Sequence, residues 1–196
     1  MKWIAITGGI ACGKSSVGDY LRSKSYVVIN ADEIVHSLFF SDKNLLLKVR
    51  ERFGDSVFDE ENLNREKLGD LVFSDPVAKK NLESIVHPLV LEKSEQLKQE
   101  AEEAGAEFAF YEIPLLFELG REAEFDSVIC VSASLDTQIT RLKKRNQLST
   151  EQALARINSQ MDMVKKIERS DFVIQNDFSN IEELHKEITK LLRENF

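Results

Sequence analysis

The sequence predicts an α/β protein with a mostly parallel, five-stranded sheet flanked by helices. Five short apolar runs are rich in β-branched and aromatic residues, helical patterns separate most of them, and a glycine-rich loop follows the first run. Strands that alternate with helices need crossover connections, which produce parallel sheets. The chain has 196 residues, of which 42% are hydrophobic, so we expect one domain with a substantial core.

The predicted strands and their flanking helices follow from residue patterns along the chain. A helix is predicted over residues 14–23, directly after the glycine-rich loop, and another over 180–195. In this last helix Ile181, Leu184 and Ile188 lie on one face, and Asn180 is placed to cap its start. The five predicted strands are residues 2–7, 26–30, 107–113, 126–132 and 171–176.

A long helical interval interrupts the alternation between the second and third strands. No strand is evident between Asp32 and Gly105. Asp42, Asn64 and Asp75 are suitable helix caps, and a proline suits the first helical position after Asp75. We interpret residues 33–105 as a helical insertion that binds an acceptor substrate. The helices predicted in it cover residues 42–54, 64–74, 75–86 and 87–105.

A second insertion, residues 134–169, follows the fourth strand and is interpreted as a helical lid. Its sequence predicts two helices that meet near Gln147, and Ser149 with Gln152 forms the pattern of a capping box for the second. The first helix is strongly basic although the chain as a whole is acidic.

Composition excludes several classes of function. The formal net charge of −8 argues against nucleic acid as the main partner, because phosphate backbones require a basic surface. No stretch approaches the ~20 apolar residues of a membrane span, and the N-terminus lacks the pattern of a signal peptide. Cys12 and Cys130 are too few for a disulfide framework, so we expect reduced thiols and a cytoplasmic protein.

The glycine-rich loop has the spacing of a phosphate-binding loop. Gly8, Gly13, Lys14 and Ser15 match the pattern G-x-x-x-x-G-K-[ST], between a predicted strand and a predicted helix. Backbone N–H groups at the helix start would bind phosphate, Lys14 would bridge the β- and γ-phosphates, and the Ser15 hydroxyl would ligate Mg²⁺. The alternative is a glycine turn that only joins a strand to a helix. The loop residues predicted to bind nucleotide are Ala11, Cys12, Gly13, Lys14, Ser15 and Ser16.

Asp32 follows the second strand at the sheet edge where α/β proteins bind ligands. Its carboxylate is suited to accept a proton from an acceptor hydroxyl or to hold a Mg²⁺-bound water. The alternative is that Asp32 only caps the following helix.

Four further residues are candidates for binding. Arg141 and Arg145 are four residues apart on the basic helix, so they share a face and are placed to stabilise phosphate charge; a solvated surface is the alternative. Asn176 ends the fifth strand, where its amide would meet an adenine edge or form a turn. His87 precedes a proline at a predicted helix junction, a place where a structural role is the alternative.

Seven stretches, in order, resemble the dephospho-coenzyme A kinase family: "TGGIACGKSS", "VINAD", "LNREKLGDLVFSD", "VHPLV", "IPLLFE", "QITRLKKRNQLSTEQALARINSQ" and "DFVIQN". They span residues 7–176. The loop alone is shared by many nucleotide-binding proteins, whereas the ordered set is specific. Many family members have Asp where this chain has Asn30, and the usual loop serine is Cys12 here. A thiol in the loop raises the hypothesis that oxidation of Cys12 blocks ATP binding.

The resemblance implies an ATP-dependent kinase that phosphorylates the ribose 3′-hydroxyl of dephospho-CoA, the last step of coenzyme A biosynthesis. It implies a five-stranded nucleotide-binding core of the phosphate-binding-loop type, a helical CoA-binding region and a lid. Asp32 becomes the base or orienting group for the hydroxyl, and Lys14 and Arg141 become charge stabilisers. Arg145 lies in the same lid and Asn176 near the ATP base. Arg65 and His87 become acceptor-binding residues.

Two other functions stay open from the residues alone. One is a kinase for another acceptor, such as a nucleoside monophosphate, and the other is a nucleotide-sensing switch that contacts a protein partner. For the kinase we expect ATP and Mg²⁺ as cofactors, dephospho-CoA as the small-molecule partner, no nucleic acid or membrane partner, and a monomer or weak homo-oligomer.

Overall fold

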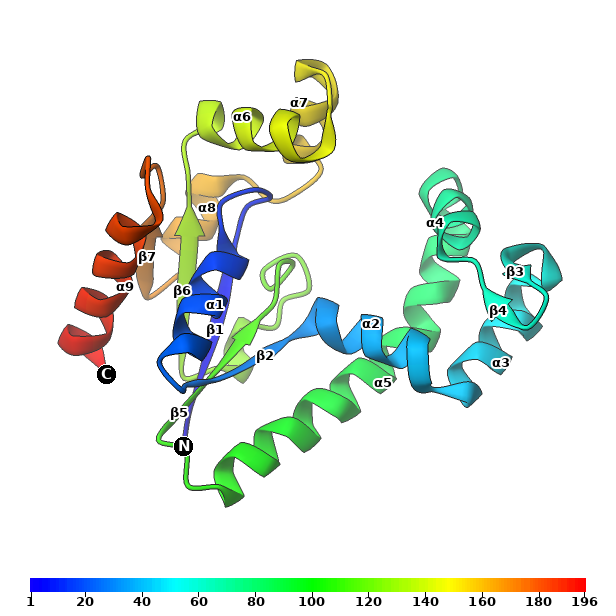
Figure 1. Ribbon diagram of the computed structural model, residues 1–196, viewed down its shortest axis with the longest axis horizontal. Coiled ribbons are helices and arrows are strands. Elements are labelled where there is room, and N and C mark those ends of the chain that lie inside the picture. Colours follow the sequence, from blue (N-terminus) through cyan, green and yellow to red (C-terminus); the bar gives the residue numbers. More distant parts are fainter. The chain divides into compact units, whose positions relative to one another are not determined.

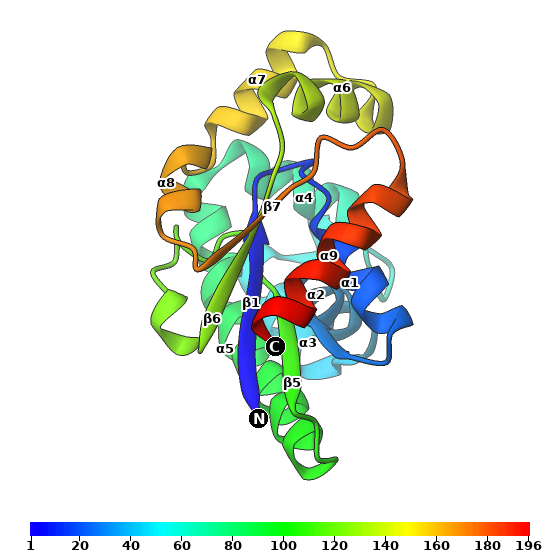
Figure 2. The ribbon, with the colours of Figure 1, turned by 90° about the vertical axis from the view of Figure 1, so that its left-hand side faces the viewer.

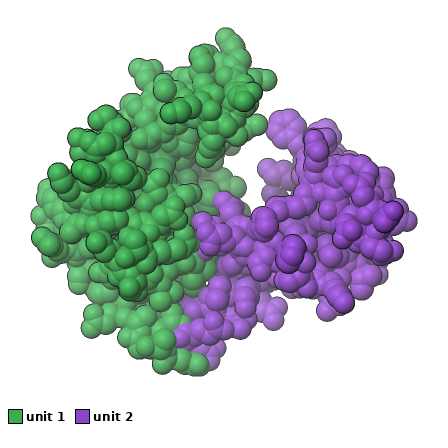
Figure 3. All heavy atoms as spheres, viewed as in Figure 1, with its two compact units in different colours: residues 1–29, 101–196 green, residues 30–100 purple.

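The computed structural model describes residues 1–196 as two compact units, which Figure 3 distinguishes by colour. One unit contains residues 1–29 and 101–196, and the other contains residues 30–100. The unit formed by both ends of the chain holds the phosphate-binding loop, the basic helix and Asn176.

A five-stranded parallel sheet forms the centre of the first unit (Figure 1), as the sequence predicts. The strand order β2-β5-β1-β6-β7 places β1 in the middle, paired with β5 on one side and β6 on the other. Each strand begins and ends within one residue of its predicted bounds, because buried parallel strands are continuous apolar runs. The strands are β1 Lys2–Gly8, β2 Val27–Asn30, β5 Phe108–Glu112, β6 Ser127–Ser132 and β7 Phe172–Gln175.

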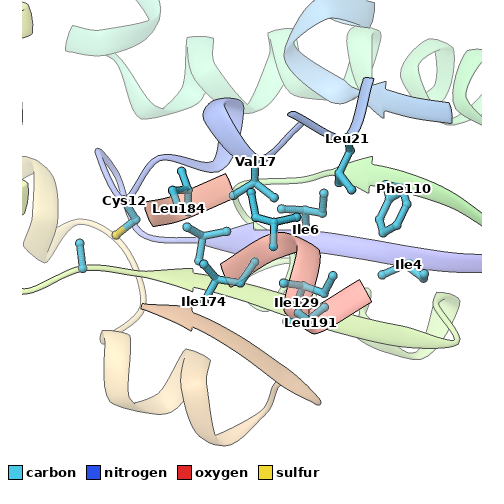
Figure 4. Close-up of a cluster of buried hydrophobic side chains, with 13 residues drawn as sticks. Ile4, Ile6, Cys12, Val17, Leu21, Phe110, Ile129, Ile174, Leu184 and Leu191 are labelled. Carbon is cyan, nitrogen blue, oxygen red and sulfur yellow. The ribbon is translucent and has the colours of Figure 1, made fainter. Parts of the chain in front are cut away.

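Helices cover both faces of this sheet. Figure 2 shows α1 (Lys14–Ser23) and α9 (Ile181–Asn195) on one face and the short α8 (Met163–Glu168) on the other. The apolar stripe of α9 packs against the sheet through Leu184 and Ile188, which confirms the predicted helix. Ile181, predicted on the same face, is exposed. The core between the sheet, α1 and α9 (Figure 4) includes Ile4, Ile6, Val17, Leu21, Phe110, Ile129, Ile174, Leu184 and Leu191.

The second unit is mainly helical, and two of the helices predicted in it are joined. The two helices predicted over 75–86 and 87–105 are one helix, α5 (Pro76–Glu103), with Pro88 inside it. The break was predicted because a residue before proline disfavours the helical conformation. The helix continues since Pro88 removes only one N–H donor and Val86 and Val90 on either side are buried. The unit's other helices are α2 Ala31–Ser41, α3 Lys43–Phe53 and α4 Arg65–Ser74.

The expectation that no strand lies between Asp32 and Gly105 is wrong. A 3₁₀ turn (Asp55–Val57) leads into a small antiparallel hairpin made of β3 (Phe58–Asp59) and β4 (Asn62–Leu63). Glu60, in the two-residue connection, has φ +56°, as tight hairpin turns require. Strands of two residues are too short to show the alternating pattern by which strands are predicted.

Residues 134–169 contain three helices where the sequence predicts two. Helix α6 (Leu135–Asn146) ends at Gln147, which has φ +53°, and α7 (Thr150–Asn158) begins with the predicted capping box at Ser149. The second predicted helix then stops, because Asp162 caps a new helix, α8, by accepting a hydrogen bond from Val164 N–H. Between β5 and β6 lies one further 3₁₀ turn, Glu122–Glu124.

Candidate active site

The loop between β1 and α1 is held in a tight conformation. Gly8 has φ +144° and Gly13 has φ +96°, a region that side chains disfavour. A Cβ atom on Gly13 would also lie 2.2 Å from the Nδ2 atom of Asn176. Gly13 is therefore required both by its own backbone conformation and by the close approach of Asn176.

The residues at the start of α1 are suited to bind phosphate. The Lys14 ammonium donates hydrogen bonds to the carbonyl oxygens of Gly8 (3.1 Å) and Gly9 (2.9 Å), so its charge lies against the loop. Ser15 is exposed and Ser16 half-buried in the first turn of the helix. That turn contains no acidic side chain, so its N–H groups and the positive end of the helix dipole are not neutralised by the chain itself.

Arg141 and Asn176 meet at the same loop. Asn176 is buried, and its Nδ2 donates to the Cys12 carbonyl at 2.7 Å. The Arg141 guanidinium donates to the Ala11 carbonyl at 3.2 Å and to Asn176 Oδ1 at 3.4 Å. These contacts join α6 to the loop, and Figure 1 shows the two side by side. The structure thus brings three separately predicted positions, the loop, Arg141 and Asn176, together.

Arg145 does not share these contacts. It lies one turn further along α6, is exposed, and donates from Nε to Asn146 Oδ1 at 3.0 Å. In this structure its guanidinium is bonded to its neighbour and not to the loop.

Cys12 has the properties of a core residue. Its side chain is fully buried, and its Sγ accepts a hydrogen bond from Gln138 Nε2 at 3.2 Å. Burial raises the pKa of the thiol, although the charge of Lys14 opposes the rise. The thiolate is the form that oxidants attack, so a buried, protonated thiol argues against the hypothesis that oxidation of Cys12 regulates ATP binding.

Two glutamines that the sequence analysis did not single out also contact the loop. Gln160 Oε1 accepts from Ile10 N–H at 2.8 Å, and Gln138 Nε2 donates to the Ile10 carbonyl at 2.8 Å. A single glutamine in a sequence indicates no particular chemistry. The available signal was position, since Gln138 lies three residues before Arg141 and so on the same face of α6.

The start of α6 is joined to the residue after Asn176. Asp177 Oδ1 accepts from Ser134 N–H at 2.8 Å, which ties the end of β7 to the first turn of α6. Desolvation alone would raise the pKa of Asp177, but hydrogen bonds from Thr137 and Ser134 outweigh it and lower the pKa to about 2. The ionised carboxylate is therefore the form that holds these two segments together.

This pKa predicts a dependence of stability on acid pH. A carboxyl whose pKa is lower in the folded state stabilises the fold above its ordinary pKa of 3.8 and loses this contribution as pH falls towards 2. Asp177→Asn keeps an accepting oxygen but does not titrate, so the variant should show a weaker decline of Tm between pH 4 and pH 2 than the parent. Differential scanning calorimetry measures both curves, and parallel curves would contradict the assignment.

The remaining predicted residues lie in the second unit. Asp32 is the second residue of α2, directly after β2, and is exposed. The alternative that Asp32 caps this helix is wrong, because Asn30 is the cap: its Oδ1 accepts from the N–H groups of Asp32 (2.8 Å) and Glu33 (3.2 Å). The Asp32 carboxylate is thus not used for capping.

Arg65 and His87 are both exposed. Arg65 is the first residue of α4, and His87 lies within α5 immediately before Pro88. His87 is therefore not at a helix junction, which removes the reason for a purely structural role there. Neither residue takes part in an ion pair in this structure.

Comparison with known proteins identifies relatives along nearly the whole chain. The model of the dephospho-CoA kinase family matches residues 2–183. A dephospho-CoA kinase of Bdellovibrio bacteriovorus is 38% identical over 98% of this chain and 96% of its own length. One from Bacillus cereus is 41% identical over 89% of this chain and 88% of its own length.

Solved structures show the same fold. A protein from Thermus thermophilus is 35% identical with a TM-score of 0.82, covering all of this chain and 98% of the other. The dephospho-CoA kinase from Campylobacter jejuni is 30% identical with a TM-score of 0.74, covering 98% of this chain and 96% of the other. A shikimate kinase from Acinetobacter baumannii, 14% identical with a TM-score of 0.56, shares the fold alone. None of the helices combines the length and apolar character needed to cross a membrane.

Proposed function

This chain belongs to the dephospho-CoA kinase family, and from that premise we propose which of its residues carry the reaction. The reaction is the ATP-dependent phosphorylation of the ribose 3′-hydroxyl of dephospho-CoA, the last step of coenzyme A biosynthesis. The observation that supports the site assignment best is the loop after β1, where Lys14, Arg141 and Asn176 all contact the backbone of residues 8–12.

The loop binds the phosphates of ATP. The first turn of α1 presents backbone N–H groups that have no acceptor within the helix, and an anion there is stabilised by the helix dipole. The Lys14 ammonium exchanges its two carbonyl partners, Gly8 and Gly9, for oxygens of the β- and γ-phosphates. The exchange is favourable because the ammonium interacts more strongly with negatively charged phosphate oxygens than with uncharged carbonyl oxygens.

Arg141 supplies the second positive charge and Asn176 lies near the ATP base. Both side chains contact the Cys12 carbonyl, so both lie on the same side of the loop. Arg145 acts from the same lid helix, where its exposed guanidinium is free of ion pairs. Positive charge at these positions lowers the cost of the negative charge carried by the phosphates.

Asp32, Arg65 and His87 act on the acceptor. Asp32 follows the end of a strand of the same sheet as β1, it is exposed, and capping by Asn30 leaves its carboxylate available. It orients the 3′-hydroxyl or accepts its proton. Arg65 supplies positive charge for the phosphates of the acceptor, and His87 supplies a hydrogen-bonding ring nitrogen. We assign the acceptor site to the helical insertion of residues 33–105.

The chain is suited to Mg²⁺ that is shared with the nucleotide. No cluster of three acidic, His or Cys side chains is present that would hold a metal by itself, whereas the exposed Ser15 hydroxyl lies beside the phosphate-binding N–H groups. Mg²⁺ commonly takes few protein ligands and keeps phosphate oxygens and waters. When bound, the ion would neutralise phosphate charge, with Ser15 as its protein ligand.

We place the enzyme in the cytoplasm, as a monomer or weak homo-oligomer, with residues 134–169 as the lid. An ATP kinase gains from a lid because excluding water limits wasteful hydrolysis. The lid's contacts with the loop, through Gln138, Arg141 and Gln160, support this role.

The direct test is ADP release from Mg·ATP with and without dephospho-CoA, followed by the mass of the product. We expect a large acceptor-dependent rate and a product heavier by one phosphate, whose position a 3′-specific nuclease or NMR then identifies. Turnover only with a nucleoside monophosphate would support the alternative kinase. Slow turnover that no small acceptor accelerates would support a nucleotide switch.

A further inference from the structure

One residue of the loop, Ile10, is held through both of its backbone groups by two side chains from residues 134–169. Ile10 has its N–H bonded to Gln160 Oε1 and its carbonyl bonded to Gln138 Nε2, each at 2.8 Å. Gln138 comes from α6 and Gln160 from the segment between α7 and α8, so the contacts span 128 and 150 residues of sequence. We call these two hydrogen bonds the Ile10 clamp.

The chemistry of the clamp is determined by the backbone. The Ile10 N–H can only donate, so Gln160 must present its oxygen to it. The Ile10 carbonyl can only accept, so Gln138 must present its NH₂ group to it. Each glutamine therefore contributes a different half of its amide, and the same substitution has opposite effects at the two positions.

Little space is left around the Gln138 amide. A Cβ on Gly9 would lie 2.6 Å from Gln138 Nε2 and 2.5 Å from Met163 Cε. The same Nε2 also donates to Cys12 Sγ at 3.2 Å, and Gln138 is only 4% exposed. Both donors of this amide are thus used on the loop, one on either side of Ala11.

Gln160 is held in place by its neighbours. Met161 N–H donates to Glu118 Oε1 at 2.9 Å, and the same oxygen lies 2.8 Å from the Nζ of Lys166, which is fully buried. Burial alone would raise the pKa of Glu118, but hydrogen bonds from Lys166 and Met161 lower it, so the carboxylate is ionised. The segment that carries Gln160 is therefore held in place by contacts that do not involve Ile10.

We propose that Gln138 and Gln160 are positioning residues for phosphoryl transfer, an inference that rests on the proposed function. Ala11, the next residue, has φ +60°, a conformation that residues other than glycine rarely adopt. The clamp holds both backbone groups of Ile10, and Arg141 donates a hydrogen bond to the Ala11 carbonyl at 3.2 Å. Together they keep the strained turn from relaxing, so the N–H groups at the start of α1 stay in place to bind the phosphates.

The test compares Gln→Glu with Gln→Leu at Gln160, using kcat, KM and calorimetric binding of ATP without acceptor. Gln160→Glu keeps an accepting oxygen and should stay within about threefold of the parent in kcat. Gln160→Leu should lower kcat by roughly 10- to 100-fold and weaken ATP binding, because misplacing the loop by about 1 Å is enough to produce losses of that size. The KM for dephospho-CoA should not change. Equal loss in the Glu and Leu variants, or no loss in either, would overturn the proposal.

Gln138→Glu gives the opposite expectation, since it places a carboxylate against the Ile10 carbonyl and should lower kcat at least tenfold. A parent-like rate here would also contradict the clamp. If this buried charge prevents folding, the comparison of Gln160→Glu with Gln160→Leu tests the proposal by itself.

Gln147→Glu, at an exposed position of residues 134–169, controls for the added charge and should match the parent. ATP binding is measured without acceptor, so a failure of the proposed acceptor does not obscure these results.

Discussion

Lys14→Ala is expected to reduce kcat/KM for ATP by at least about 10²–10³-fold, the loss typical of removing one preorganised group that stabilises transition-state charge. The side chain is the one cation that lies against the carbonyls of Gly8 and Gly9. Alanine removes the charge and leaves the glycine backbone and Asn176 contacts in place, so the fold should persist. Steady-state kinetics with dephospho-CoA measures the loss.

A control separates this loss from unfolding. Lys24→Ala removes a lysine at the other end of α1, whose ammonium lies over the half-buried Tyr20 ring at 5.3 Å. It should keep parent-like kinetics, and both variants should show cooperative melting. Near-parent activity in Lys14→Ala would remove Lys14 from the catalytic assignment.

Asp32→Asn is expected to lower kcat by about 10²–10⁴-fold with little change in ATP binding, the range typical of losing a general base. The substitution is nearly isosteric, and the capping of α2 depends on Asn30 and not on this carboxylate. Stability should therefore change little. Single-turnover kinetics with saturating ATP and dephospho-CoA isolates the chemical step.

The structure offers a matched control for Asp32. Glu182 is also the second residue of a helix capped by an asparagine, Asn180, and it is exposed. Glu182→Gln removes the same charge from the same helical position in α9 and should leave kcat unchanged. If Asp32→Asn behaves like this control, the carboxylate has no part in the reaction. A small loss in the chemical step would indicate an orienting role, since a loose transition state needs little proton abstraction.

The sequence predicted the features that depend on local pattern. The five strands were found because each is a continuous apolar run, and the loop was found because its glycines and Lys14 have fixed spacing. The hairpin at Phe58–Leu63 was missed because two-residue strands have no period. Helix α5 was divided at Pro88 because the local preference of a residue before proline was overridden by buried neighbours.

The candidate site was predictable as a set of positions but not as a set of contacts. Arg141 and Asn176 were proposed separately, and only the packing of α6 against the end of β7 shows that they share one carbonyl. Gln138 and Gln160 were missed because their partner is the backbone of Ile10, which any residue type supplies. A side chain that bonds to a backbone group can have any residue type as its partner, so the sequence does not reveal the contact.

The central place of β1 has a consequence for how the protein is made. Its neighbours are β5 and β6, so Lys2 pairs opposite Phe108 and Ile4 opposite Ser127. At typical synthesis rates of about 5–20 residues per second, the apolar first strand waits roughly 5–20 s before its first partner is synthesised. The unit of residues 30–100 is complete within that interval. The nascent chain thus carries an unpaired, aggregation-prone first strand while residues 30–100 have already been synthesised. Ribosome-bound chaperones that cover apolar segments would act on this strand during the interval.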